Sequence, residues 1–166
     1  MKLDDYLQIG RTVYLGSHTF TPEAIMAFAA KYDPQPFHID EAEALGTVLG
    51  RLCASGWHTA AVWMRLNVDV GMTAAPATWT GEGKPPEIGP SPGITNLKWL
   101  KPVYAGETIY FSRIATGHRK LSSRPLWFVM SLRAEGNDSQ GDKVIEFESS
   151  VLVQSENYTN LSSSDV

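Results

Sequence analysis

The sequence predicts an α+β fold in which an antiparallel sheet wraps around one long apolar helix. The first observation is a helix pattern in the middle of the chain, SGWHTAAVWMRLNVD, beginning at Ser55. The second is the run of alternating, β-branched and aromatic residues that follows, which predicts four strands at 94–102, 107–116, 125–135 and 143–153. Four consecutive strands favour an antiparallel meander, and the sheet buries its apolar face most simply by covering the helix.

The first part of the chain adds a strand and a helix. Residues 12–20, TVYLGSHTF, are rich in residues that favour strands and predict a strand or hairpin. A helix is expected over about 22–31, because Thr21 can cap it and Pro22 fits the first helical position.

Two further helices are expected before the predicted sheet. Asp40 and Glu43 have the spacing of a capping box, and Gly46 ends the short helix that they begin. The next helix starts at the cap residue Ser55, and its apolar residues form one stripe, which predicts a helix deeply covered by other structure. That stripe consists of Trp57, Ala61, Met64 and Val68, and it is widened by Ala60 and Trp63.

Glycine and proline dominate residues 71–93, so a long loop is expected between the last helix and the strands. The final segment, SENYTNLSSSDV, is polar and is expected to be frayed. We therefore expect a single domain over residues 1–154 and a polar tail over residues 155–166.

Composition and charge exclude several classes of protein. The chain has 166 residues, 43% of them hydrophobic and 19% charged, which is enough to bury a core. Its formal net charge of −4 argues against a general nucleic-acid-binding protein. No stretch has the roughly 18 apolar residues that span a bilayer, and the N-terminus lacks the apolar run of a signal peptide. We expect a cytoplasmic protein that binds neither nucleic acid nor membrane.

The segment KYDPQPFHID places an acid and an imidazole on a stiff piece of chain. Asp33 and Gln35 each precede a proline, which keeps them out of the helical region. Each proline also fixes its own φ, so we expect residues 33–37 to be stiff and largely extended. Such a segment holds Asp33 and His38 at a fixed separation, as general acid–base catalysis requires. A turn aspartate and a structural histidine are the alternative.

A second motif, CASGWH, lies at the start of the long helix. The first amide N–H groups of a helix have no partner within it, and the helix dipole there favours an anion. Gly56 lets an anion approach the backbone closely. We expect Ser55, Gly56 and Trp57 to form an oxyanion and substrate-binding site, although a cap alone would also explain Ser55. The two motifs together suit chemistry next to a carbonyl.

These motifs resemble those of the MaoC-like dehydratases, which include the (R)-specific enoyl-CoA hydratases. The resemblance rests on FAAKYDPQPFHIDEAEA, from Phe28, and on GRLCASGWHTAAVWMRL, from Gly50. The later LKWLKPVYAGETIYF resembles a strand and turn of the same family, so the likeness covers roughly residues 10–154. It implies a hotdog fold, with a long central helix wrapped by an antiparallel sheet, and an acyl thioester as substrate.

The resemblance also implies roles for individual residues. In the family, an Asp and a His hold and activate the water that adds to C3 of a trans-2-enoyl-CoA, and a glycine N–H polarises the thioester carbonyl. The matching positions hold Asp33, His38 and Gly56. Coenzyme A is then part of the substrate, with no separate cofactor. The chain departs from the family's usual pattern with Gln35 for Asn, Tyr32 for Gly and Ala61 for a helix serine.

Two functions from different classes follow from the resemblance. The favoured one is a hydratase or dehydratase of an acyl thioester, adding water to trans-2-enoyl-CoA to give (R)-3-hydroxyacyl-CoA, or the reverse. The other is a catalytically silent hotdog subunit that binds acyl thioesters or pairs with an active partner. The intact Asp33 and His38 pair favours the enzyme. A thioesterase is less favoured, because it is not usually built on this loop.

Other charged or reactive residues have two interpretations each. Arg119, Lys120 and Arg124 cluster between two predicted strands, where they either contact the phosphates of coenzyme A or form a solvated turn. Cys53 is interpreted as a small core residue rather than a nucleophile. Trp99 either lines a pocket or is buried in a core or interface, and burial is favoured. The four histidines lack the spacing of metal ligands, so no metal site is expected.

The predicted sheet leaves strand edges open, and open edges invite pairing with another chain. The resemblance adds that hotdog proteins commonly pair their sheets edge to edge, with active sites near the subunit boundary. We therefore expect a homodimer or a dimer of dimers.

Overall fold

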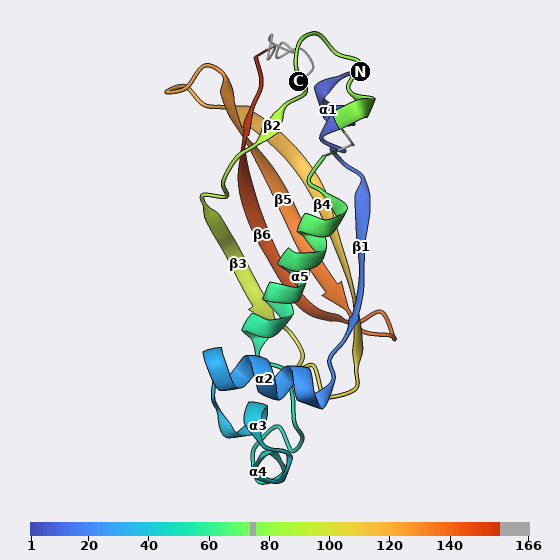
Figure 1. Ribbon diagram of the computed structural model, residues 1–166, viewed down its shortest axis with the longest axis vertical. Helices are drawn as coiled ribbons and strands as arrows, with labels where there is room; N and C mark the ends of the chain where they lie inside the picture. Colours follow the sequence, from blue (N-terminus) through green and yellow to red (C-terminus); the bar gives the residue numbers. More distant parts are fainter. Residues whose placement is uncertain (74–75, 157–166) are drawn as a thin grey trace.

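The computed structural model describes residues 1–73 and 76–156 (Figure 1). Within these residues, six strands form an antiparallel sheet that curls around one long helix, α5 (Gly56–Val70). Three shorter helices lie beyond one end of the sheet, near the start of α5: α2 (Pro22–Tyr32), α3 (Pro36–Ile39) and α4 (Glu41–Leu45). The predicted α+β class, with a sheet wrapped around a long helix, is confirmed.

The strand order is β1-β4-β5-β6-β2, and β3 also pairs with β6. The bounds of the strands are Thr12–Thr19 (β1), Glu87–Ile88 (β2), Gly93–Trp99 (β3), Thr108–Lys120 (β4), Trp127–Asn137 (β5) and Lys143–Gln154 (β6). Strands β4, β5 and β6 form consecutive antiparallel pairs, so this part of the predicted meander is confirmed.

The prediction is wrong for the strand that precedes β4. Strand β3 pairs with β6 instead of β4, so it lies on the opposite side of the sheet from β1 (Figure 1). The chain after β3 makes no hairpin, because it pairs with the segment that leads into α5. Ala54 N–H donates to Val103 O at 2.7 Å, and Ala105 N–H donates to Leu52 O at 3.0 Å. This crossing brings Trp99, the last residue of β3, to the start of α5.

The predicted helix caps are present. In each, a side-chain oxygen accepts a hydrogen bond from a main-chain N–H: Thr21 from Ala24, Asp40 from Glu43, and Ser55 from Trp57. The predicted extended segment 33–37 is wrong in its second half. Gln35 is extended, but Pro36 begins the single turn of α3, because the fixed φ of proline also suits the first helical position.

The four main residues of the apolar stripe of α5 face away from the sheet, so their predicted deep covering is wrong for a single chain, whereas Ala60 and Trp63, which widen the stripe, pack against the core. The exposed fractions of Trp57, Met64 and Val68 are 53%, 44% and 63%, and Ala61 is also exposed. The helix instead packs on the sheet through Trp63, which is 1% exposed and donates from Nε1 to the main-chain carbonyl of Ser112. Apolar residues lie on both sides of α5, so the periodicity of the sequence alone does not identify the side that packs on the sheet.

Two core clusters hold the described residues together. The larger lies between α5 and the sheet and contains Phe20, Ile25, Trp63, Phe111 and Ile145. The smaller lies at the other end of the sheet and includes Tyr6 of α1 (Leu3–Tyr6), a helix that the sequence did not predict.

The predicted loop over residues 71–93 holds two short elements, η1 (Pro76–Thr78) and β2. Ser155, the first residue of the predicted tail, is buried and its N–H donates to Leu126 O, whereas residues 157–166 lie outside the described part. Among the helices described, none is long and apolar enough to cross a membrane.

Candidate active site

Three separate segments of the chain meet at the start of α5. Residues 52–54, which lead into α5, run between the turn that carries His38 and the connection from β3 to β4. On one side, Cys53 N–H donates to Phe37 O at 3.1 Å, and on the other, Ala54 N–H donates to Val103 O at 2.7 Å. The turn that carries His38 and the connection from β3 to β4 are therefore both fixed by main-chain bonds to the chain that leads into α5.

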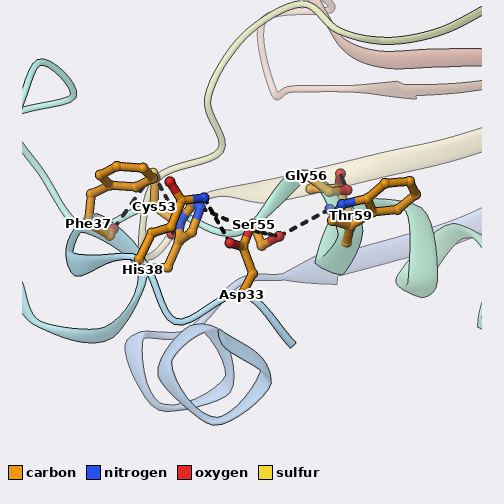
Figure 2. A network of polar contacts seen from close by, with 9 residues as sticks. Asp33, Phe37, His38, Cys53, Ser55, Gly56 and Thr59 are labelled. Atoms are coloured by element: carbon orange, nitrogen blue, oxygen red, sulfur yellow. Dashed lines mark hydrogen bonds and ion pairs between the residues drawn. The ribbon is translucent and has the colours of Figure 1, made fainter. Parts of the chain in front are cut away.

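Asp33 and His38 face each other, as the sequence predicted (Figure 2). His38 is 6% exposed, and its Nδ1 lies 2.7 Å from Cys53 O. Because a carbonyl oxygen can only accept, Nδ1 carries a hydrogen and donates it. This leaves Nε2 directed at Asp33, 3.4 Å from Oδ2. The Cys53 carbonyl thus fixes both the orientation and the tautomer of the His38 imidazole.

Both carboxylate oxygens of Asp33 accept hydrogen bonds from neighbouring side chains. Ser55 Oγ donates to Oδ2 at 2.6 Å, and Gln35 Nε2 donates to Oδ1 at 2.8 Å. Burial raises the pKa of Asp33, but the hydrogen bonds from Ser55 and Gln35 and the charge of His38 together outweigh burial and lower this pKa below its usual value. Asp33 is therefore ionised at neutral pH and is able to accept a proton.

Gly56 is the first residue of α5, at the end of the helix where main-chain N–H groups lack helical partners. Within the described residues, no acceptor is paired with the Gly56 N–H. The indole of Trp99 lies against the Cα of Gly56, since a Cβ built on this glycine would be 2.7 Å from Trp99 Cδ2 and closer still to Cε2. Trp57 meets Trp99 edge to face, with ring centroids 5.1 Å apart. Ser55, Gly56 and Trp57 therefore lie beside the acid–base pair.

These residues line a pocket of about 400 Å³. Asp33, His38 and Gly56 all contribute to it, and the apolar remainder of its wall includes Leu49, Ala54, Leu100, Pro102, Val103 and Val144. Trp99 also lines this pocket and is 45% exposed, so it is not buried in the core of one chain, and its burial in an interface stays a prediction. The pocket joins the buried His38 and the half-buried Asp33 to the unpaired N–H of Gly56 across an apolar surface.

The predicted phosphate-binding residues lie elsewhere. Arg119 and Lys120 end β4 and Arg124 follows in the turn to β5, which Figure 1 places at the opposite end of the sheet from α2 and α3. Within one chain these three residues are not brought together with Asp33 and His38. Their contact with coenzyme A stays a prediction.

The buried thiol of Cys53 is not activated. Its Sγ lies 3.7 Å from His38 Nδ1, but burial, reinforced by the charge of Asp33, raises the pKa of Cys53 to about 11. A thiol with this pKa is protonated at neutral pH and is a poor nucleophile. Across the described residues, no group of three or more His, Cys, Asp or Glu side chains is placed to hold a metal ion.

Two site residues were not assigned a role from the sequence. Gln35 was noted for its place before a proline and as a departure from the family pattern, yet its spacing of two from Asp33 also permits the hydrogen bond that it makes. Lys101 lines the pocket and donates to Asp138 at 2.6 Å and Asp142 at 2.9 Å, and these hydrogen bonds raise its pKa. No local signal identifies Lys101, because its position depends on the crossing of the chain after β3.

Comparison with known proteins decides the family. The model of the MaoC like domain matches residues 6–125. The chain belongs to the MaoC-like family. The likeness predicted from residues around Asp33 and Gly56 is thereby confirmed.

Similar proteins include members of known structure. The crystal structure of a MaoC-like dehydratase from Rhodospirillum rubrum has a TM-score of 0.73 and 30% identity, covering 90% of this chain and 96% of that one. The (R)-hydratase from A. caviae involved in PHA biosynthesis has a TM-score of 0.64 and 25% identity, covering 87% and 96%. YdeM of Bacillus subtilis (strain 168) is 27% identical over 154 residues, covering 93% of this chain and 99% of YdeM. The predicted hotdog fold is confirmed for this MaoC-like chain.

Proposed function

We propose that this MaoC-like protein hydrates a trans-2-enoyl-CoA to a 3-hydroxyacyl-CoA, or catalyses the reverse dehydration. The observation that carries the proposal is the Asp33 carboxylate facing His38 Nε2 at 3.4 Å in a pocket that also exposes the first residue of α5. An acid–base pair beside an unpaired helix N–H matches the needs of proton transfer next to a carbonyl.

The pair is arranged to hold one water molecule. His38 Nδ1 already donates to Cys53, so an unprotonated Nε2 and Asp33 Oδ2 are two acceptors facing the same space. A water there donates one hydrogen to each, and its oxygen lone pairs then point away from the pair. Asp33 Oδ2 retains capacity for this bond beside the one from Ser55, because a carboxylate oxygen accepts two.

Hydration then needs two proton movements. As the water oxygen bonds to C3, one water proton passes to the Asp33 and His38 pair, and the C2–C3 π electrons move toward the thioester carbonyl. A proton from the pair returns to C2, which restores the carbonyl. Negative charge grows on the thioester oxygen between these steps, where the Gly56 N–H stabilises it. Dehydration is the same sequence reversed.

The relatives support an (R) product. The A. caviae protein, which matches 87% of this chain, is an (R)-hydratase, and the Rhodospirillum rubrum protein, a MaoC-like dehydratase, supports the reaction type alone. The apolar walls of the pocket suit the acyl part of such a substrate.

The test is purified protein with crotonyl-CoA. We expect the enoyl absorbance to fall and (R)-3-hydroxybutyryl-CoA to appear, and the rate to be lost when Asp33 is replaced by Asn. Crotonyl-CoA is a short substrate, so hexenoyl-CoA and octenoyl-CoA are assayed in parallel. A protein that binds all three thioesters and hydrates none is the silent subunit, and the enzymatic proposal is then wrong.

We also propose that the protein acts as a homodimer. Within the part of the chain that the structure describes, strand β3 pairs only with β6, so one of its edges is open there. The exposed stripe of α5 reaches the pocket at Trp57. A second copy on this surface covers both features. Light scattering should give about 37 kDa or a multiple, twice the chain mass of 18.3 kDa. Met64→Glu should lower this mass, whereas a parent of single-chain mass that hydrates substrate contradicts the proposal.

A further inference from the structure

We propose that Trp99 supplies a second hydrogen-bond donor to the thioester oxygen, from its indole Nε1–H. The inference rests on the proposed function, because it concerns the same carbonyl, and it assigns a catalytic residue beyond Asp33, His38 and Gly56. Enolate-like charge on a thioester oxygen is better stabilised by two converging donors than by one.

The two nitrogens are close enough to share one oxygen. A Cβ built on Gly56 would lie 2.5 Å from Trp99 Nε1. Covalent geometry puts the amide nitrogen of any residue about 2.5 Å from its own Cβ position, so the two nitrogens are at most about 5 Å apart. Two donors that each lie about 2.9 Å from one acceptor are separated by no more than about 5.8 Å. This separation therefore permits one thioester oxygen to accept from both.

Both donors are available. Within the described residues, neither the Gly56 N–H nor the Trp99 indole N–H is paired with an acceptor. The indoles of Trp63 and Trp79 behave differently, since the first donates to Ser112 O and the second to Gly83 O. A half-exposed indole that lines the pocket and keeps its N–H free is placed to bind a substrate atom.

The position of the indole is fixed from several sides. The residue after it, Leu100, donates its N–H to Val144 O at 2.8 Å, which continues the pairing with β6. Lys101 follows and is held by Asp138 and Asp142 in the turn between β5 and β6. On the open side, the ring of Trp57 stands edge to face against the Trp99 indole. A donor held in this way needs little reorganisation when charge develops.

The glycine at position 56 follows from the same geometry. Any side chain there would overlap the Trp99 ring, because its first carbon would lie inside normal contact distance of three ring atoms. The absence of a Cβ at Gly56 thus lets the substrate approach the amide and lets the Trp99 indole pack against the glycine Cα.

The test compares Trp99→Phe with the parent. Phenylalanine keeps an aromatic ring at the pocket but removes the N–H. We expect kcat for crotonyl-CoA to fall by about 10- to 100-fold, since loss of one oxyanion donor costs up to about 1,000-fold and Trp99 is partly open to water. The KM should change much less than kcat, because the bond strengthens in the transition state.

A spectroscopic measurement separates this role from a packing role. The C=O stretching frequency of a bound, carbonyl-labelled enoyl-CoA should move to lower energy in the parent and move less in Trp99→Phe. Trp79→Phe is the matched control, because Trp79 packs on Tyr6 in the other core cluster and its indole N–H already has an acceptor. We expect parent values of kcat and of the frequency for this control.

The outcomes distinguish the two proposals. A parent that hydrates crotonyl-CoA and shifts the carbonyl frequency, with Trp99→Phe equal to it in both, overturns the assignment of Trp99 and leaves the hydratase proposal intact. A parent that neither hydrates an enoyl-CoA nor shifts its carbonyl overturns both. Thermal melts of the variants show whether any loss of rate reflects unfolding.

Discussion

Replacing Ser55 by Ala should move the pH dependence of the reaction and not only its rate. The Ser55 hydroxyl has two roles, because its oxygen accepts from Trp57 N–H at 3.2 Å and its hydrogen goes to Asp33 Oδ2 at 2.6 Å. The first role caps α5. The second lowers the pKa of Asp33, so the carboxylate stays ionised to lower pH.

The magnitude follows from the kind of hydrogen bond that is lost. A hydrogen bond to a charged group is worth about 1.5–3 kcal/mol, and 1.36 kcal/mol corresponds to one pH unit. Removing it raises the pKa of Asp33, and activity that needs the carboxylate is then lost at higher pH than in the parent. The ionised form of Asp33 therefore loses about 1.5–3 kcal/mol of stabilisation, and we expect the acid limb of kcat/KM to move to higher pH. The lost cap should separately lower the free energy of unfolding by about 1 kcal/mol.

The assay is the pH profile of kcat/KM for crotonyl-CoA from pH 4 to 9. Ser55→Thr keeps a hydroxyl and should restore much of the parent profile. Thr21→Ala is the matched control, because Thr21 also caps a helix but its side chain bonds to Ala24 N–H instead of to Asp33. It should lose stability without a shift of the acid limb. A Ser55→Ala profile that is lower but unshifted would refute the role given to this hydrogen bond.

Four further substitutions test the acid–base pair, the first residue of α5 and a buried histidine outside the pocket. Asp33→Asn and His38→Gln should each lower turnover by at least about 100-fold with parent-like thermal melts, and near-normal turnover in either removes that residue from the mechanism. Gly56→Ala should displace the half-exposed Trp99 indole, because the new Cβ would overlap its ring, and should lower kcat by about 10-fold or more with little loss of stability. A rate assay and a thermal melt measure the two effects. An unchanged kcat contradicts the predicted overlap between the Cβ and the indole. Burial lowers the pKa of His58 to about 4, so the fold favours the neutral form of this side chain. The free energy of unfolding should therefore fall by up to about 3 kcal/mol as the pH drops from about 6.5 toward 4. Urea titrations at pH 7 and pH 5 should show a smaller fall for His58→Phe than for the parent.

Local signals in the sequence were sufficient for α2, α4, α5 and most strands, but not for the four-residue helices α1 and α3. The cap residues Thr21, Asp40 and Ser55 make the hydrogen bonds expected of them, because a cap depends only on residues two or three positions away. The place of β3 was not predictable in this way. Its pairing with β6 depends on Val103 and Ala105 bonding to residues 52–54, and that contact joins segments about fifty residues apart.

The choice of which face of α5 packs on the sheet shows a second limit of prediction from sequence. The stripe from Trp57 to Val68 has the periodicity of a buried helix face, yet the helix turns Trp63 toward its own sheet. The periodicity indicates that a helix face is apolar, but it does not indicate which other surface covers that face. The same limit applies to Trp99, whose half-exposed place over Gly56 follows from the crossing of β3.

The acid–base pair was the most predictable part of the site, and the structure gives the physical reason. Pro34 and Pro36 restrict the chain around Asp33 and Gln35, so the carboxylate and the imidazole are related by local geometry. The partners that orient them were not predictable from this loop. The Cys53 carbonyl that fixes the His38 tautomer lies 15 residues away, and the Ser55 hydroxyl lies 22 residues from Asp33.

Residues 52–54 link all the groups that the proposed reaction uses. This segment bonds through its main chain to the turn that carries His38 and to the connection that follows Trp99, and it continues directly into Ser55 and Gly56. The distances between the acid, the imidazole and the helix N–H are therefore set by main-chain hydrogen bonds and not by flexible side chains alone. A site assembled before substrate binds spends little binding free energy on ordering its own groups, which leaves more of it to stabilise the transition state.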